Sequence, residues 1–325
     1  MFERYTGLTA QQMEEQLYVE IQSALYSRYG PNPDVIVKQS VDEEWNAIKR
    51  TGLVATVAFL YEIVSWARQE HVSVQIYPGG SLILYLLGVT LANPLPSHSL
   101  CPNCRRVLWE HESDGFDLTV PDLFWLTNEH CACECGSSTV VCDGHDIPLE
   151  IVFGGTEDFT PHFHIVFEEE SDADYKGVTT ADIRNLALSS WKQLMMSDSI
   201  PDDLPAPRTF AELIANFCLI HGTGLWNEDA KFMVEKMQCS TVCLLYCQED
   251  VFRYYLNHGY SEKEAWIILR KICTGEYQPF FAEHTSEMVY DKDAWLLNLL
   301  NQQGLRLLSK AYVVEYILHQ LNRLL

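Results

Sequence analysis

The hydrophobic and polar positions of the first hundred residues predict a helix, a strand and a second helix. Apolar residues recur with helical spacing over about 42–69, and the continuous apolar run at 54–66 indicates that this helix is buried. The extended segment 72–77 follows, and Pro78-Gly-Gly predicts a turn before a second apolar helix that begins at Ser81. A strand, a glycine turn and a helix in this order are expected of an α+β core.

The pattern changes twice in the rest of the chain. Residues 146–167 alternate between apolar and polar side chains, which predicts a strand. From Thr209 the spacing is helical to the end, and two helix starts have the reciprocal capping spacing, at Thr209 with Glu212 and at Ser261 with Glu264. The sequence therefore predicts a mixed region followed by a helical region.

These changes divide the chain into four parts, and the predicted fold class is α+β. An N-terminal helical segment covers residues 1–42 and a mixed domain covers 43–167. An acidic linker at 168–206 leads to an all-helical domain at 207–325.

The charge of the chain argues against a nucleic-acid partner. The 325 residues include 45 acidic and 22 basic side chains, which gives a net charge of −23, and residues 101–204 alone carry 21 acidic and five basic side chains. Proteins that bind DNA neutralise its phosphates with basic side chains, so we expect weak or absent DNA binding. A protein partner with a basic surface fits this charge better.

Neither a secretory signal nor a membrane span is evident. The residues after Met1 lack an apolar signal core, and the longest apolar run, at 82–92, is shorter than the roughly 20 residues that a spanning helix needs. We therefore expect a cytoplasmic protein without a membrane partner. The eleven cysteines are an odd number, and six lie between residues 101 and 142, which in a reducing compartment indicates a metal site rather than disulfides.

The cysteine-rich insertion at 99–142 has the spacing of a structural zinc site. Cys101 and Cys104 form one Cys-x-x-Cys knuckle, and a second, irregular set ends at Cys135. The predicted fourth ligand is Cys131, with Cys133 as the alternative, because the spacing alone leaves this choice open. The alternative is a set of free thiols that remain from a decayed zinc ribbon.

Five motifs around and after this insertion resemble one polymerase family in the same order. They are the segments 93–104, 143–150, 207–213, 221–226 and 309–312. The chain resembles the PolC-type catalytic subunit of bacterial DNA polymerase III, as a truncated and degenerate relative. The resemblance implies a palm-like domain at 43–167 with the zinc ribbon at 99–142, a fingers-like domain at 207–325, and a partner associated with replication.

The chain departs from this family where the polymerase binds its catalytic metals. The family has two aspartates, one residue apart, on the strand that follows the 143–150 motif, and this chain has His162 and His164 there. Alternation along a strand places both histidines on one face. Imidazole is a poor ligand for Mg²⁺, which prefers oxygen, and the segment with the family's third carboxylate has no counterpart in 168–206. We therefore expect no bound Mg²⁺ and a non-catalytic protein that binds or regulates a partner.

A metal-dependent enzyme is the alternative function. His162 and His164 can bind a transition metal, with Asp158, His145 or the carboxylates of 168–170 completing the ligands. Such a site would support residual polymerase activity or a phosphoesterase activity.

The turn that binds substrate phosphates in the family is also altered. This chain keeps Gly80 and Ser81 but has Gly79 where the family has an arginine. The resemblance therefore implies that the triphosphate has lost a bidentate cation. These residues can also be read simply as a strand-to-helix turn that glycine makes possible.

Overall fold

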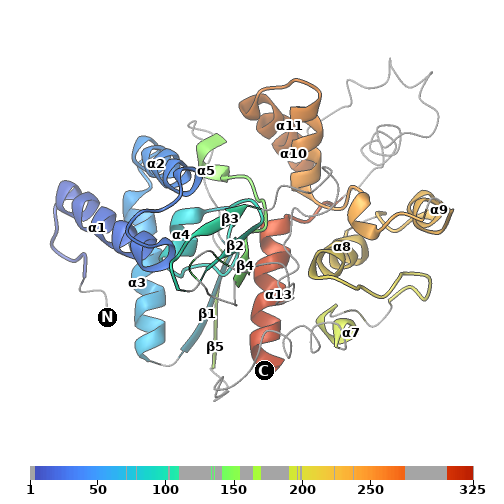
Figure 1. Cartoon of the computed structure of the whole chain (residues 1–325), viewed down its shortest axis with the longest axis horizontal. Coiled ribbons are helices and arrows are strands. Elements are labelled where there is room, and N and C mark those ends of the chain that lie inside the picture. The colour runs from blue at the N-terminus through green and yellow to red at the C-terminus, as the bar shows by residue number, and fades with distance from the viewer. Residues whose placement is uncertain are drawn as a thin grey trace.

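The structure of the protein is a computed structural model. The described residues are 4–70, 72–77, 79–101, 103–109, 133, 135, 141–153, 164–169, 190–195, 197, 200–222, 224–236, 238–274 and 306–324. In Figure 1, helices α1–α4 and the strands lie on the left, helices α8 and α9 on the right, helices α10 and α11 at the top, and helix α13 between the left and right groups. The fold is α+β, with helices predominating over two small antiparallel sheets.

Three long helices build most of the N-terminal side: α1 (Ala10–Tyr29), α2 (Val35–Arg50) and α3 (Val54–Gln69). The predicted single helix over 42–69 is wrong, because α2 ends before Gly52 and α3 begins after it. Gly52 has a φ of 71°, in the left-handed region that interrupts a helix, and the Thr51 hydroxyl donates to the carbonyl of Ala47. The expected domain boundary at residue 42 lies inside α2.

The first sheet pairs strands that are far apart in the sequence. Strand β1 (Val72–Tyr77) runs antiparallel to β5 (His164–Glu169), with Val72 opposite Glu169 and Tyr77 opposite His164. Helix α4 (Leu82–Leu86) begins after Ser81, whose hydroxyl accepts from the Leu84 N–H. The predicted order of strand, turn and helix is thus confirmed.

The predicted strand over 146–167 is correct only near its end. Within the described residues, β5 begins at His164, whereas Glu150–Phe153 form the short helix α5. Asp146 has a φ of 47° and Pro148 has no N–H to donate to a ladder, and both features prevent a strand at the start of this segment.

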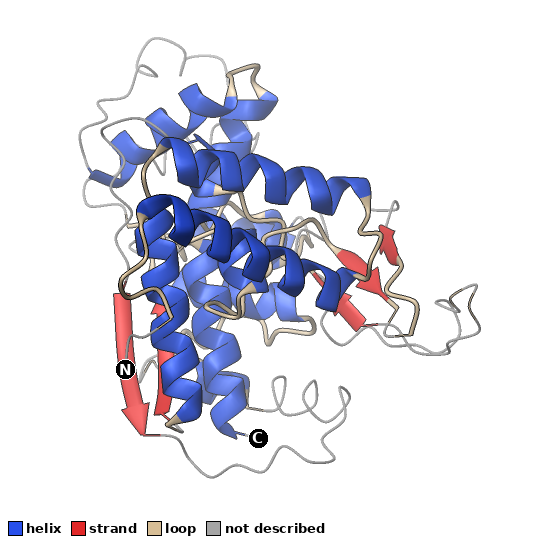
Figure 2. Cartoon of the chain, turned by 90° about the vertical axis from the view of Figure 1, so that its left-hand side faces the viewer, coloured by secondary structure: helices blue, strands red, loops and turns tan. Residues whose placement is uncertain are grey.

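A second sheet carries the cysteine-rich insertion. Strand β2 (His98–Leu100) lies in the centre, between β3 (Val107–Trp109) and β4 (Val141–Asp143), and both pairings are antiparallel. Figure 2 shows the two sheets as separate groups of strands on opposite sides of the helices.

The C-terminal side is built from helices, as predicted. They are α7 (Trp191–Leu194), α8 (Phe210–His221), α9 (Glu228–Lys236), the 3₁₀ helix η1 (Thr241–Cys243), α10 (Gln248–Asn257), α11 (Glu262–Thr274) and α13 (Lys310–Leu324). Ser261 and Glu264 form the predicted reciprocal cap. At Thr209 only half of the cap forms, because the Glu212 carboxylate accepts from the backbone N–H of Arg208 instead.

Two hydrophobic cores lie on the two sides, and α13 connects them. The N-terminal core includes the fully buried Leu17 and Ile76, and the C-terminal core includes Phe210 and Val313. Helix α13 packs against both α8 and β1. The buried carboxylate of Glu315 accepts from the hydroxyl of Thr90 and from the N–H groups of residues 91 and 92. No helix in the described part of the chain is long and apolar enough to cross a membrane.

Candidate functional site

Four cysteine sulfurs converge at the edge of the β2–β3 hairpin. The Sγ atoms of Cys101, Cys104, Cys133 and Cys135 all lie within 4.8 Å of one another. The closest pairs are Cys104 with Cys133, at 3.4 Å, and Cys101 with Cys135, at 3.6 Å. Four thiolates around a tetrahedral ion with metal–sulfur bonds of about 2.3 Å would be roughly 3.8 Å apart. The cluster can therefore hold a metal ion.

The second knuckle contributes Cys133, which the sequence gave as the alternative to Cys131. Cys131, the other candidate, lies outside the described residues, whereas Cys133 is buried beside Cys104. Within the described part of the chain, this cysteine cluster is the one group of three or more histidine, cysteine or acidic side chains with metal-binding geometry.

The backbone of the first knuckle favours a thiolate. The Cys101 N–H donates to the carbonyl of Arg106, and the Arg105 N–H donates back to the carbonyl of Cys101. Desolvation opposes ionisation of the Cys101 thiol, but backbone N–H groups of Cys104 and Asn103 outweigh it and lower its pKa to about 6. Metal ions bind the thiolate form of cysteine, so the backbone N–H groups of this turn favour the form of Cys101 that can bind a metal ion.

The turn at Gly79–Ser81 connects β1 to α4 at the end of the first sheet. Gly79 has a φ of 78°, and a Cβ on Gly80 would lie 2.1 Å from the carbonyl oxygen of Pro148. Both positions therefore require glycine for a structural reason. The Ser81 hydroxyl donates to the carboxylate of Glu44, a fully buried group that also accepts from the Ile83 N–H. Burial raises the pKa of Glu44 to about 7.

An acidic side chain lies against Gly79. A Cβ on Gly79 would be 2.6 Å from the carboxyl group of Glu150, at the start of α5, and the Glu150 N–H donates to the carbonyl of Gly80. Burial and the neighbouring Glu249 raise the pKa of Glu150 to about 8. Both effects favour the protonated form of this carboxyl.

His164 lies at the same end of the sheet as this turn. It is the first residue of β5 and is paired with Tyr77, the last residue of β1. His162, Asp158 and Glu170 lie outside the described residues. His145 is 1% exposed and packs against Phe210, and burial lowers its pKa to about 4.

Sequence reasoning missed one ionic cluster, formed by Arg28, Tyr85 and Asp143. The buried carboxylate of Asp143 accepts from the Arg28 guanidinium, from the Tyr85 hydroxyl at 2.6 Å and from the Gly144 N–H at 2.8 Å. Burial would raise the pKa of Asp143, but Arg28, His98 and the Tyr85 hydroxyl outweigh it and lower the pKa to about 2. Nothing in the local sequence around Arg28 indicates this partner, which is 115 residues away.

These features lie in a region that is similar to a known protein family. Residues 15–171 match the family model described as the bacterial DNA polymerase III alpha NTPase domain. That region contains the β1–α4 turn, the four clustered cysteines and β5. Over this region the chain is similar to PolC-type DNA polymerase III.

Individual relatives agree with this match. The chain is 31% identical to the PolC-type DNA polymerase III of Ureaplasma parvum over 142 residues, which are 43% of this chain and 9% of that protein. It is 28% identical to the Clostridium perfringens protein of the same name over 162 residues, or 49% of the chain and 11% of the relative. The Bacillus subtilis protein is 29% identical over 160 residues, which are 46% of this chain and 10% of the relative. The chain therefore spans about a tenth of the length of the curated relatives that it matches.

Proposed function

We propose that this chain is a non-catalytic relative of the polymerase that acts through a protein partner in DNA replication. The observation that carries the proposal is the position of His164 beside the Gly79–Ser81 turn, through the pairing of His164 with Tyr77. As the resemblance implies, this strand end is where the polymerases hold their catalytic aspartates. Histidine in that position does not provide the hard oxygen ligands that two magnesium ions require.

The surroundings of Gly79 support the same proposal. The resemblance places an arginine at residue 79, where it would meet the substrate phosphates. In this chain the group that lies against residue 79 is the carboxyl of Glu150. A carboxyl supplies no positive charge to a triphosphate and repels it when ionised.

We further propose that the cysteine cluster holds a structural zinc ion. Four sulfurs within 4.8 Å of one another form a closed, thiolate-rich set, which leaves no open position for a reacting water. The ion would stabilise the ribbon at 99–142, which lies within the palm-like part at 43–167. In the proposed polymerase-like arrangement, the acidic linker at 168–206 joins the palm-like part to the fingers-like part at 207–325.

The primary test is primer extension. Purified protein is expected to add no deoxynucleotide to a primed template with Mg²⁺ or Mn²⁺, because the metal ligands and the phosphate cation are replaced together. An active PolC-type polymerase in the same buffer serves as the positive control. Template-dependent extension that disappears in the His162→Ala/His164→Ala variant would show a catalytic site and overturn the proposal.

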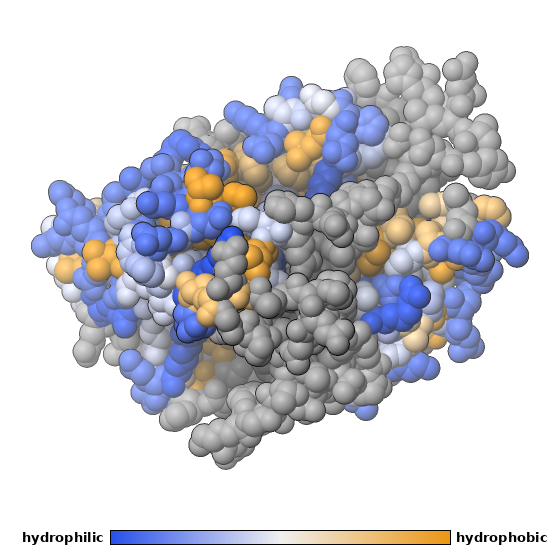
Figure 3. Space-filling model, viewed as in Figure 1, coloured by the Kyte–Doolittle hydropathy of each residue, from blue (hydrophilic) through white to orange (hydrophobic). Residues whose placement is uncertain are grey.

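The charge of the chain predicts a basic partner. Arg253 is one of the basic groups on the helical side. Its guanidinium is already paired with Asp146 and is therefore less available to a DNA phosphate. The face in Figure 3 is mostly hydrophilic over the described residues, with separate apolar patches. A partner that is attracted by charge fits this surface better than one bound by a single large apolar contact.

Two measurements test this prediction about partners. In fluorescence anisotropy, primer-template DNA is expected to bind with a Kd weaker than about 10 µM at roughly 150 mM salt, because a net charge of −23 repels phosphates. Proteins captured from a lysate by the immobilised chain are expected to be basic and to elute as salt rises. Submicromolar DNA affinity that weakens with salt, or capture of acidic proteins alone, would contradict the prediction.

A further inference from the structure

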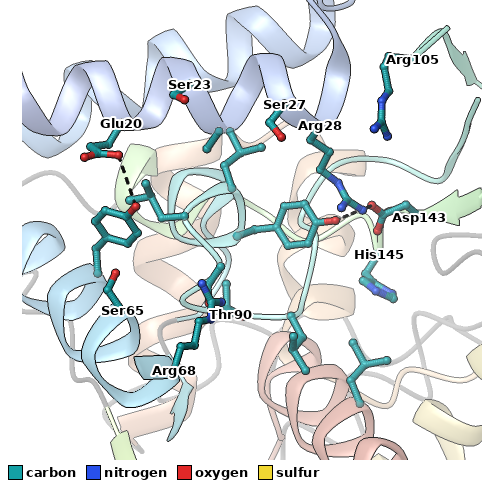
Figure 4. A pocket seen from close by; sticks show the side chains of 18 residues that line it. Glu20, Ser23, Ser27, Arg28, Ser65, Arg68, Thr90, Arg105, Asp143 and His145 are labelled. Carbon is teal, nitrogen blue, oxygen red and sulfur yellow. Dashed lines mark hydrogen bonds and ion pairs between the residues drawn. The ribbon is translucent and has the colours of Figure 1, made fainter. Parts of the chain in front are cut away.

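A large polar cavity lies between α1, α3, the α4 region and the start of the 143–150 motif. Its volume is about 1040 Å³, which is large enough for a ligand of metabolite size. Hydroxyl groups of Ser23, Ser27, Ser65 and Thr90 line it. In Figure 4, Arg28, Arg105, Asp143 and His145 lie on the right of the cavity, and Glu20, Ser65 and Arg68 on the left. The Gly79–Ser81 turn does not line this cavity.

The charged groups of the cavity do not cancel. Asp143 is paired with Arg28, and Glu20 is paired with Arg4, which is not a lining residue. Neither Arg68 nor Arg105 forms an ion pair with a residue that the structure describes. Among the described residues, the cavity therefore has two guanidinium groups without an acidic partner, although that of Arg68 donates to the Gly88 carbonyl at 2.7 Å.

Arg105 is held at the cavity by an unusual backbone conformation. Its φ is 61°, in the left-handed region that is unfavourable for a residue with a side chain. A Cβ on Gly30, at the end of α1, would lie 3.0 Å from the Arg105 Cβ, so the knuckle is packed tightly against the helix that carries Ser27 and Arg28. Glycine would fit this turn without strain, and strained residues of this kind gather at functional sites.

Two side-chain nitrogen atoms of residues that line the cavity lack a hydrogen-bond partner in the described structure, and a ligand oxygen could supply it. Arg28 Nε and His145 Nδ1 are buried, and neither has a hydrogen-bond partner in the described structure. Buried polar nitrogens are paired in the great majority of cases. Both residues line the cavity, and His145 is 1% exposed.

We propose that this cavity binds a phosphorylated small molecule with at least two anionic groups. Arg105 and Arg68 supply the positive charge, because guanidinium groups form strong charge-assisted hydrogen bonds with phosphate oxygens. The hydroxyl groups of Ser23, Ser27 and Ser65 then donate to the remaining oxygens, whereas the Thr90 hydroxyl already donates to Glu315. This proposal does not depend on whether the chain is catalytically inactive.

Calorimetric titration of metal-replete protein tests the proposal, with pyrophosphate, fructose 1,6-bisphosphate and ATP as the probes. We expect at least one probe to bind with a micromolar Kd, and the comparison among them separates inorganic, sugar and nucleotide sources. Arg105→Gly is expected to weaken that probe about tenfold or more, since one charge-assisted contact is lost. Arg68→Gln is expected to have a similar effect.

The matched control is Arg106→Ala, which removes the same charge from the next residue, outside the cavity lining. It is expected to change the Kd by less than about twofold. Arg105→Gly also separates binding from folding, because glycine suits a φ of 61° and the melting temperature should not fall. The proposal is overturned if no probe binds below about 1 mM, or if Arg105→Gly and Arg106→Ala have equal effects on affinity.

Discussion

Replacing Cys104 by serine is expected to abolish metal binding and to open the cysteine-rich ribbon. The Cys104 sulfur lies 3.4 Å from that of Cys133, within a cluster whose members all lie within 4.8 Å of one another. Serine is not ionised at neutral pH and cannot replace a thiolate, and a zinc ion held by three ligands is bound far more weakly. Structural zinc contributes on the order of 10 kcal/mol in small domains. We expect the loss to appear as local unfolding of the ribbon.

Elemental analysis and limited proteolysis measure the two parts of this prediction. The parent protein should contain one zinc per chain and resist cleavage between residues 101 and 135, whereas Cys104→Ser and chelator-treated protein should contain none and be cut there. Cys273→Ser is the matched control, because Cys273 is an exposed cysteine outside the cluster. Equal zinc content in the parent and in Cys104→Ser would rule out the site.

Gly80→Ala is expected to destabilise the fold more than any other single-methyl change in the Gly79–Ser81 turn. The added Cβ would lie 2.1 Å from the carbonyl oxygen of Pro148, a backbone atom that cannot rotate away. Either β1 or the segment before α5 must move, which typically costs about 3 kcal/mol. The close approach of these two segments is what places Glu150 against the turn.

Gly79→Ala provides the comparison for this experiment. Its Cβ would meet the carboxyl of Glu150, which is the flexible end of a side chain, so the main cost comes from the φ of 78°. That cost is about 1 kcal/mol. Urea denaturation of both variants should therefore give a smaller free energy of unfolding for Gly80→Ala than for Gly79→Ala. The reverse order would show that the backbone approach at Pro148 is less rigid than the structure indicates.

Features that depend on neighbouring residues could be predicted from the sequence. The strand at Val72–Tyr77, the turn after it and the helix that follows Ser81 have local signals, and so does the cap formed by Ser261 and Glu264. The cysteine spacing gave a short set of possible ligands. It could not decide between Cys131 and Cys133, because that choice depends on how the second knuckle folds back toward β2.

Features that depend on distant residues could not be predicted. The apolar spacing continues through Gly52, so it did not indicate that one helix ends and another begins there. The alternation of apolar and polar residues over 146–167 predicted a single strand, but only β5 is a strand and Glu150–Phe153 form α5. The Arg28–Asp143 pair joins residues 115 apart, and no periodicity indicates such a contact.

The hydrogen bonds of Glu315 join two parts of the chain that lie far apart in the sequence. The carboxylate that satisfies the Thr90 hydroxyl and the N–H groups of Leu91 and Ala92 belongs to a helix made more than 220 residues later. Before α13 has docked, these donors can bind only water, and the segment that carries them is not yet held in place. Contacts over such separations form slowly, so this joint between the two sides is expected to form late in folding.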